Sequence, residues 1–346
     1  MGLPIRDIVP SEEVGWAELA GKTLAVDAYN AIYQFLATIR QPDGRLFTDG
    51  DGRVTSHLMG VFYRTTSLLG DGVRPVWVFD GRPPELKSGT IRGRIAVKER
   101  AETEWKEALA VGDLERARRK AAQTSRLTGP MVAEAKEVLS ALGVPHVQAP
   151  SEGEAQAARM AARGVVWGAA SEDYDCLPFG APRLVRGLAA RGNRAKGNLA
   201  QLIDRAALLT RLGINDEELI MLGIVVGTDY NEGAAGFGPK KALKLVQQHL
   251  GFEATLKAAG LDPAELQPVA ELFRNPETSD VAAPLFGPVN DSEVHRLLVE
   301  GHGFSPERVQ AGVRKARQPA TAPPPAAATP PRGRQPMLES FGEGAE

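Results

Sequence analysis

Short apolar runs that lead into a carboxylate recur along this chain, and they constrain its fold more than any other feature. The acids at or just beyond the ends of five such runs are Asp27, Asp80, Glu152 with Glu154, Asp173 with Asp175, and Asp229. A short apolar run bounded by turn residues is typical of a buried strand. In an open parallel sheet the carboxyl ends of the strands meet at one edge, and ligands bind there. Because converging acids repel one another unless a cation holds them, the pattern predicts a site for hard divalent cations.

The order of apolar runs and helical periodicities predicts an α/β fold. Strands are expected over Leu24–Ala28 and Arg74–Phe79, with helices over Ala31–Leu36 and Ser56–Leu69 between them. Further strands are expected within Pro145–Ser151, Val165–Ser171 and Ile224–Asp229, although residues 217–226 also have the pattern of a helix. Strands joined through helices favour a mostly parallel, twisted sheet with right-handed crossovers, flanked by helices.

Residues 82–130 differ from the rest of the chain. After Pro83 and Pro84, two charged helices are expected, Ile91–Ala110 and Leu114–Ser125. Residues 82–126 hold twelve Lys and Arg against seven Asp and Glu, so this stretch carries +5 and the remainder −7, within a total of −2. The segment has few large apolar side chains and is expected to bury little. It is either a solvated helical pair or a mobile basic arm over the acidic cleft.

The composition is that of an average soluble globular protein. The 346 residues are 43% hydrophobic and 24% charged, which suits one large domain or two ordinary ones. No apolar run is long enough to span a membrane, and the first residues do not form a signal peptide. The single cysteine, Cys176, excludes an internal disulfide and fits a reducing interior.

The residue types at the expected strand ends favour magnesium. Oxygen-only sites select Mg²⁺ or Mn²⁺, whereas zinc prefers His and Cys. The histidines are scattered without ligand spacing, at His57, His146, His249, His295 and His302. Seven acids exceed what one Mg²⁺ needs, because this ion keeps several of its waters. Two ions about 4 Å apart would use them, and that arrangement serves in-line phosphoryl displacement by water.

Each acid also has a purely structural interpretation. These are a capping box for Ser151 and Glu154, a helix cap for Asp27 and Asp229, and a turn for Asp173 and Asp175. In an extended chain, however, an Asp-x-Asp pair directs both side chains the same way. Any one acid can be structural, but the coincidence of all of them at strand ends favours a functional cleft.

The stretch Gly233–Lys241 resembles a helix-hairpin-helix turn between two helical segments. In such a turn glycine lets the backbone approach closely, and free N–H groups at a helix start bind a phosphate. The alternative is an ordinary connection between helices. Nucleotide cofactors have no support, because the near-match to a phosphate-binding loop at residues 15–23 is one residue too long and precedes a strand.

Taken together, the motifs are similar to those of flap endonucleases, the archaeal and eukaryotic members of the structure-specific 5′ nuclease superfamily. The segments that carry the resemblance are Met1-Gly2, Val26–Ala28, Thr55–Thr65, Val78–Ser88, Gln148–Ala155, Ser171–Leu177, Gly227–Asn231 and His302–Val309. The resemblance covers nearly the whole chain. It implies a PIN-like nuclease domain over residues 1–312, with a helical arch at about 82–130 and a helix-hairpin-helix motif at about 215–250.

The resemblance also implies a role for each matching residue. The metal ligands of the family fall on the seven acids named above. Lys87 and Arg94 match basic residues that contact the scissile phosphate and stabilise developing charge. Tyr33 matches an aromatic residue that stacks on a base, and Gly2 is expected near the site. Other DNA contacts are implied for Arg64 and Thr55–His57, in a pocket for a one-nucleotide 3′ flap, and for Gly236, Gly238, Lys240 and Lys241, which would hold duplex backbone beside a bound K⁺.

The last residues, 313–346, form a Pro- and Ala-rich tail that is expected to be disordered. Within it Gln335, Leu338 and Phe341 match the family's sliding-clamp motif, at residues 335–342, while Gly342 stands in place of a second aromatic anchor. The implied partners are branched DNA with a 5′ flap and a sliding clamp, for a monomeric protein without a membrane. Because no long basic tail follows the motif, an archaeal-type cytoplasmic protein is expected.

The implied function is Mg²⁺-dependent cleavage of 5′ flaps at duplex junctions, with 5′–3′ exonuclease activity, in DNA replication and repair. Two Mg²⁺ ions are expected, for which Mn²⁺ can substitute. One alternative is another nuclease of the superfamily, either an exonuclease or a nuclease that cuts bubbles or junctions. The other is a non-catalytic DNA-binding clamp adaptor on a degenerate nuclease fold. The adaptor fits poorly, because none of the seven acids is lost.

Overall fold

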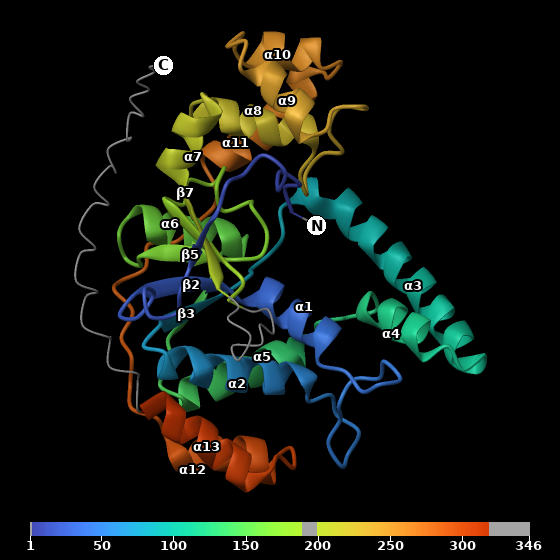
Figure 1. Cartoon of the computed structure of the whole chain (residues 1–346), viewed down its shortest axis with the longest axis vertical. Helices are drawn as coiled ribbons and strands as arrows, with labels where there is room; N and C mark the ends of the chain where they lie inside the picture. The colour runs from blue at the N-terminus through green and yellow to red at the C-terminus, as the bar shows by residue number, and fades with distance from the viewer. Residues whose placement is uncertain (1, 189–198, 318–346) are drawn as a thin grey trace, which may run out of the picture.

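The centre of the molecule is a seven-stranded sheet with helices on both faces (Figure 1). The computed structural model describes residues 2–188 and 199–317. In the order β1-β7-β6-β5-β2-β3-β4, the strands are Glu12–Val14, Ala200–Asp204, Arg183–Arg186, Gly168–Ala170, Thr23–Asp27, Arg74–Phe79 and His146–Gln148. The strands from β6 to β4 are parallel, and β7 runs antiparallel to both β6 and β1. This confirms the predicted α/β class with a mostly parallel sheet.

Two hydrophobic cores lie on opposite faces of the sheet. Side chains alternate along a strand, so Leu24 of β2 and Trp77 of β3 enter one core, while Ala25 and Val76 enter the other. The first core is shared with α1 (Ala28–Thr38), α2 (Ser56–Gly70) and α5 (Gly129–Ala141), and the second with α6 (Gly153–Ala162) and α8 (Asp216–Val226). Burial on both faces explains why the central strands are continuously apolar.

The strand predicted at Ile224–Asp229 is wrong. Its apolar residues form the last turn of α8, which ends at Val226. This helix begins with a capping box between Asn215 and Glu218, and it is buried on nearly every side. A run of consecutive apolar residues at the buried end of such a helix cannot be distinguished from a strand by its pattern. The helical pattern noted for residues 217–226 was the correct one.

Helices α3 (Ser88–Ala110) and α4 (Leu114–Ala122) form a pair that projects away from the sheet (Figure 1). The helix α3 follows a short 3₁₀ turn, η1 (Glu85–Lys87). The buried residues of the pair are small: Ala101, Ala108, Ala117 and Ala121. The prediction that this segment buries few large apolar side chains is therefore confirmed. Helix α3 starts three residues before the expected position, and α4 ends three residues early.

The remaining helices lie at the two ends of the molecule (Figure 1). They are α7 (Arg205–Leu212), α9 (Pro239–Val246), α10 (Phe252–Ala258), α11 (Pro263–Arg274), α12 (Asp291–His295), the π-helical turn η3 (Arg296–Glu300) and α13 (Pro306–Arg317). Helices α9 to α11 join α8 at one end, and α13 packs against α2 at the other. Because α13 continues to Arg317, the expected boundary after residue 312 falls inside a helix. Within the two described ranges, every helix is too short or too polar to cross a lipid bilayer.

Candidate active site

A cavity of about 420 Å³ lies between α1, the α3–α4 pair and the carboxyl ends of β2 and β3. Its charged lining consists of Asp27, Asp80, Glu152, Glu154, Asp173 and Asp229, together with Lys87, Arg94 and Lys98. The seventh predicted acid, Asp175, lies just beyond this lining and is buried. The structure therefore brings the predicted acids together, with basic side chains among them.

Asp27 is both the last residue of β2 and the cap of α1. Its Oδ1 accepts a hydrogen bond from the backbone N–H of Asn30 at 3.0 Å, which confirms the helix-cap interpretation. Its Oδ2 lies 3.4 Å from the Ser171 hydroxyl. The same carboxylate thus starts a helix and lines the cavity.

Asp80 follows β3 and is held by the start of α6. Its Oδ1 accepts from the backbone N–H of Gly153 at 2.8 Å. A Cβ on Gly153 would lie 2.5 Å from that oxygen, closer than such atoms approach. Glycine is therefore required between Glu152 and Glu154 for Asp80 to take this position.

The capping-box interpretation of Ser151 and Glu154 is wrong. The cap position of α6 is occupied by Glu152, one residue later, and its side chain makes no capping hydrogen bond. Glu154 instead accepts a hydrogen bond at 2.8 Å from the hydroxyl of Ser171, across the sheet edge. Its carboxylate is therefore directed into the cavity and does not close the helix.

Asp173 and Asp175 lie on residues 171–175, here called the acid loop, which follows β5. The backbone N–H of Leu3 donates to Asp175 Oδ1 at 3.0 Å. A Cβ on Gly2 would lie 2.6 Å from the Asp173 Cβ and 2.7 Å from Asp175 Oδ2. Both acids thus face the N-terminal segment, and Gly2 lies against them as the resemblance implied.

Asp229 follows α8 and is contacted by two basic side chains. Arg94 donates to both of its carboxylate oxygens, at 2.6 and 2.7 Å. The Lys87 ammonium lies 3.3 Å from Asp229 Oδ2 and 2.6 Å from Glu152 Oε2. The two residues expected to contact a phosphate therefore lie among the acids.

Negative charge is in excess in this cluster. Burial, followed by neighbouring carboxylates, raises the pKa of Asp27 and of Glu154 well above the usual range. The same causes raise the pKa of Asp80 to about 6 and that of Asp175 to about 7. Burial opposes the charge of Lys87, but the surrounding carboxylates prevail and raise its pKa, so the ammonium stays protonated.

This donor set fits a hard cation. Carboxylate oxygens are the ligands that Mg²⁺ and Mn²⁺ prefer, and Lys87 and Arg94 offset only part of the charge of seven acids. Across the part of the chain that the structure describes, no group of three or more acidic, His or Cys side chains is placed to hold a metal ion. Oxygens of Glu152 and Asp229 are instead engaged by the two basic residues. The acids are gathered in one cavity, and the protein's own basic groups contact some of them.

Other predicted DNA contacts have different environments. Tyr33 lines the cavity, with the Lys98 ammonium 4.7 Å from its ring centroid. Arg64 is half-buried on α2, outside the cavity lining. The side chains of Thr55–His57 are buried, and His57 Nε2 lies 2.9 Å from Glu134 Oε2. The side chains of Thr55, Ser56 and His57 are therefore packed within the protein in this structure.

The glycine-rich turn joins α8 to α9 and is largely exposed, although Ala234 is buried. Gly236 has φ +76°, and Gly238 is the cap position of α9, with no side-chain capping bond. Lys240 is exposed, while the Lys241 ammonium lies 4.0 Å from the ring centroid of Phe237. The backbone N–H groups at the start of α9 are therefore accessible to an anion. The clamp residues Gln335, Leu338 and Phe341 lie outside the described residues.

Sequence reasoning missed Asn30, which also lines the cavity. Its side-chain amide donates to Asp173 Oδ2 at 2.9 Å. The signal was available, because a residue three positions after Asp27 at the start of a helix lies on the same face as that acid.

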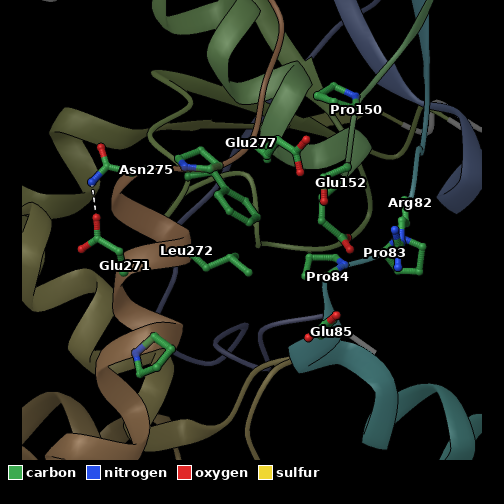
Figure 2. Close-up of a pocket in the computed structure, with 15 residues that line it drawn as sticks. Arg82, Pro83, Pro84, Glu85, Pro150, Glu152, Glu271, Leu272, Asn275 and Glu277 are labelled. Carbon is green, nitrogen blue, oxygen red and sulfur yellow. Dashed lines mark hydrogen bonds between the residues drawn. The ribbon is translucent and has the colours of Figure 1, made fainter.

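A second cavity, of about 630 Å³, adjoins Glu152 (Figure 2). Its walls are residues 82–85, residues 150–152 and α11 with the following loop. Figure 2 shows Leu272 of α11 facing Pro84 and Glu152. Glu152 therefore lines both this proline-rich cavity and the acidic one.

Comparison with known proteins gives consistent matches over the chain. The XPG N-terminal domain model matches residues 6–101, and the XPG I-region model matches residues 143–229. Flap endonuclease 1 of Aeropyrum pernix is 46% identical over 329 residues, which cover 91% of this chain and 94% of that protein. Flap endonuclease 1 of Pyrococcus horikoshii is 42% identical over 349 residues, covering 99% and 98%. The solved flap endonuclease-1 of Methanococcus jannaschii is similar at a TM-score of 0.73 with 38% identity, covering 91% of this chain and 98% of that one.

Proposed function

The chain belongs to the flap endonuclease 1 family and is a structure-specific 5′ flap endonuclease, and we propose that it hydrolyses the phosphodiester with two Mg²⁺ ions held by its seven clustered acids. The supporting observation is one cavity lined by six carboxylates, with the seventh beside it and too few basic groups to balance them. Bound ions of this kind stabilise developing negative charge and activate water. Mn²⁺ shares the ligand preference and is expected to substitute.

Lys87 and Arg94 are proposed to bind the scissile phosphate. The Arg94 side chain is 41% exposed, and its planar guanidinium suits two phosphate oxygens at once. The Lys87 side chain is 13% exposed and acts as a point charge from within the acid cluster. Both would exchange a carboxylate partner for a phosphate oxygen, so each offers its positive charge where the reaction develops negative charge.

Tyr33 is proposed to stack on a base of the DNA at the cavity mouth. The ring of Tyr33, on α1, lines the cavity, and the ammonium of Lys98, on α3, lies over this ring. An aromatic face beside a cation suits a nucleobase with its phosphate, because stacking and charge act together. Gly2, packed on Asp173, would let the N-terminal segment lie close to the reacting strand.

The Gly236–Lys241 turn is proposed to hold the backbone of the duplex, with K⁺ beside it. Gly236 and Gly238 leave the start of α9 open, and Lys240 adds an exposed charge. Lys240→Ala should weaken DNA binding uniformly across sequences and lower the slope of log affinity against log salt by about one. Equal salt slopes for wild type and Lys240→Ala would exclude the phosphate contact proposed for Lys240.

Arg64 on α2 is proposed to contact DNA at the other end of the molecule, near the 3′ flap.

The tail is proposed to bind a sliding clamp through Gln335, Leu338 and Phe341. Because Gly342 replaces one aromatic anchor, the affinity is expected to be weaker than for a motif with two aromatic residues. Phe341→Ala should abolish binding of the tail to the clamp in calorimetry, and retained affinity would contradict the assignment. The protein is further proposed to act as a monomer and to be located in the cytoplasm.

The acid cluster is tested by Asp175→Asn, which keeps the size of the side chain and removes its charge. Cleavage of a 5′-flap substrate in Mg²⁺ should fall by roughly 10²- to 10³-fold, a loss typical of removing charge stabilisation at a reacting centre. Affinity for the same DNA should stay near that of wild type. Glu253→Gln, an exposed acid on α10, is the matched control and should cut normally. A near wild-type cleavage rate for Asp175→Asn would refute the proposal.

A further inference from the structure

The acid loop carries two of the seven acids without regular secondary structure. A loop of this kind has no ladder of backbone hydrogen bonds to fix its shape, so side chains from neighbouring elements must do so. Ser171 secures one end, since its hydroxyl donates to Glu154 and also accepts from the backbone N–H of Asp173 at 3.2 Å. Two further side chains, one from α1 and one from β6, contact the middle of the loop.

Asn30 of α1 holds the loop from the side of the cavity. Its amide nitrogen donates to Asp173 Oδ2 at 2.9 Å, and its amide oxygen lies 3.4 Å from the backbone nitrogen of Glu172. Because the backbone N–H of Asn30 also donates to Asp27, one residue connects an acid of β2 with an acid of the loop. An amide is needed for this, since a carboxylate at position 30 would repel both acids.

Arg186, the last residue of β6, contacts the loop through its backbone and through Tyr174. Its Nε and one terminal nitrogen donate to the carbonyl oxygen of Glu172 at 3.1 and 2.9 Å. The guanidinium also lies 4.1 Å from the ring centroid of Tyr174 and donates to its hydroxyl. The backbone N–H of Gly187 donates to the Glu172 carboxylate at 2.8 Å. Residues 172 and 174, which alternate with the two acids, are therefore both fixed by β6.

We propose that Asn30 and Arg186 are positioning residues that orient Asp173 and Asp175 for divalent cations. The inference rests on the proposed metal centre. Asn30 occupies one oxygen of Asp173 and leaves the other free for an ion. Arg186 fixes the residues on either side of Asp173, so that the backbone cannot turn the acids out of the cavity. Groups of this kind, which orient a ligand without touching the metal, typically change metal affinity or activity by about 10- to 100-fold when removed.

The primary test is Mn²⁺ binding to the DNA-free protein, measured by calorimetry. Asn30→Leu should weaken Mn²⁺ binding by about 10- to 100-fold, because the donor to Asp173 is lost. Arg186→Gln should do the same. Arg186→Lys should bind Mn²⁺ almost as weakly as Arg186→Gln, since an ammonium cannot make the paired, planar contacts of a guanidinium. The melting temperature without metal shows that each variant is folded.

Arg183→Gln is the matched control for Arg186. Arg183 also lies on β6 and also approaches an aromatic ring, that of Trp167, but it contacts no residue of the acid loop. The substitution Arg183→Gln should therefore leave Mn²⁺ affinity unchanged. An equal loss of affinity in Arg183→Gln would show that β6 acts only through general stability, and would overturn the assignment to Arg186.

Asp173→Asn separates this inference from the proposed function. If Asn30 acts through Asp173, adding Asn30→Leu to Asp173→Asn should cause no further loss of Mn²⁺ affinity. If Asp173→Asn weakens Mn²⁺ binding but Asn30→Leu and Arg186→Gln do not, the positioning roles are wrong and the metal centre stands. If Asp173→Asn itself leaves Mn²⁺ binding unchanged, the metal centre is wrong. Fully additive losses in the double variant would also contradict the role of Asn30.

Discussion

At the scale of single residues, the site is dominated by repulsion between buried carboxylates. Carboxylates are buried beside one another, and the pKa of Asp80 and of Asp175 rises because burial and like charge both disfavour ionisation. Lys87 opposes this rise at both acids. The basic residue is therefore a structural counter-ion as well as a proposed phosphate ligand.

Lys87→Met tests this double role. We expect flap cleavage in Mg²⁺ to fall by roughly 10²- to 10³-fold, because a positive charge is lost where negative charge develops. The pKa values of the neighbouring acids should also rise, which NMR titration of the carboxyl carbons without metal can measure. Lys106→Met, an exposed lysine on α3, is the control and should change neither quantity. Unchanged carboxyl titrations in Lys87→Met would contradict the counter-ion role.

His57 predicts a pH dependence of stability. Burial, with His302 nearby, lowers its pKa to about 4, so the folded state holds it neutral. Between pH 6.5 and about 4 the unfolded chain binds the proton more readily, and the free energy of unfolding therefore falls as the pH falls. The loss amounts to roughly 2–3 kcal/mol across this window. Urea unfolding of wild type should show this loss, and His57→Gln should show less of it. Identical pH dependence in both proteins would contradict the assignment.

Residue patterns predicted the acids better than their partners. Asp27 and Asp80 were found because apolar strands end at them, which is a local signal. The spacing from Asp27 places Asn30 on the same helix face as that acid, but its contact with a loop more than 140 residues away, and that of Arg186 with a residue 14 positions away, depend on the folded sheet. The position of Asp229 was predicted correctly although its element was not, since a buried helix end resembles a strand end.

At the scale of elements, the α3–α4 pair is braced by the loop that follows α1. Arg40 is buried and donates to the carbonyl oxygens of Leu36 and Gly44 and to the hydroxyl of Ser125, just beyond α4. The Trp105 indole of α3 donates to the Asp43 carbonyl oxygen at 3.0 Å. Sequence patterns predicted both helices but not this bracing, because it depends on hydrogen bonds to backbone groups.

Arg40→Met should loosen the helical pair. Hydrogen bonds between Arg40 and the loop are lost, and each typically contributes about 0.5–1.5 kcal/mol, or more when charged. Amides of α3 and α4 should exchange with deuterium faster, while those of β2 and β3 keep their protection. Arg45→Met, an exposed arginine of the same loop, should exchange like wild type. Uniformly faster exchange across the whole protein would indicate global destabilisation and contradict a local brace.

At the scale of the whole molecule, the sheet topology places the site. The chain builds β2, β3 and β4 in one direction and then crosses back to add β5 and β6 on the other side of β2. Ligands of open α/β sheets bind where the strand order reverses in this way. Asp27, Asp80 and the acid loop follow the three strands at this point, so the fold itself collects the acids. Apolar runs that alternate with helical periodicities predicted this layer, and the helical segments on either side of the glycine-rich turn were predicted at one end of it.

The most direct test of the acid cluster is the anomalous difference map of crystals of the protein soaked in Mn²⁺. Two peaks are expected in the cavity among the seven acids, within direct or water-mediated reach of their oxygens. The same soak of Asp175→Asn crystals should lose or weaken at least one peak. A wild-type map without a peak in this cavity, from crystals that cleave a 5′ flap once dissolved in Mn²⁺, would contradict the proposed metal centre.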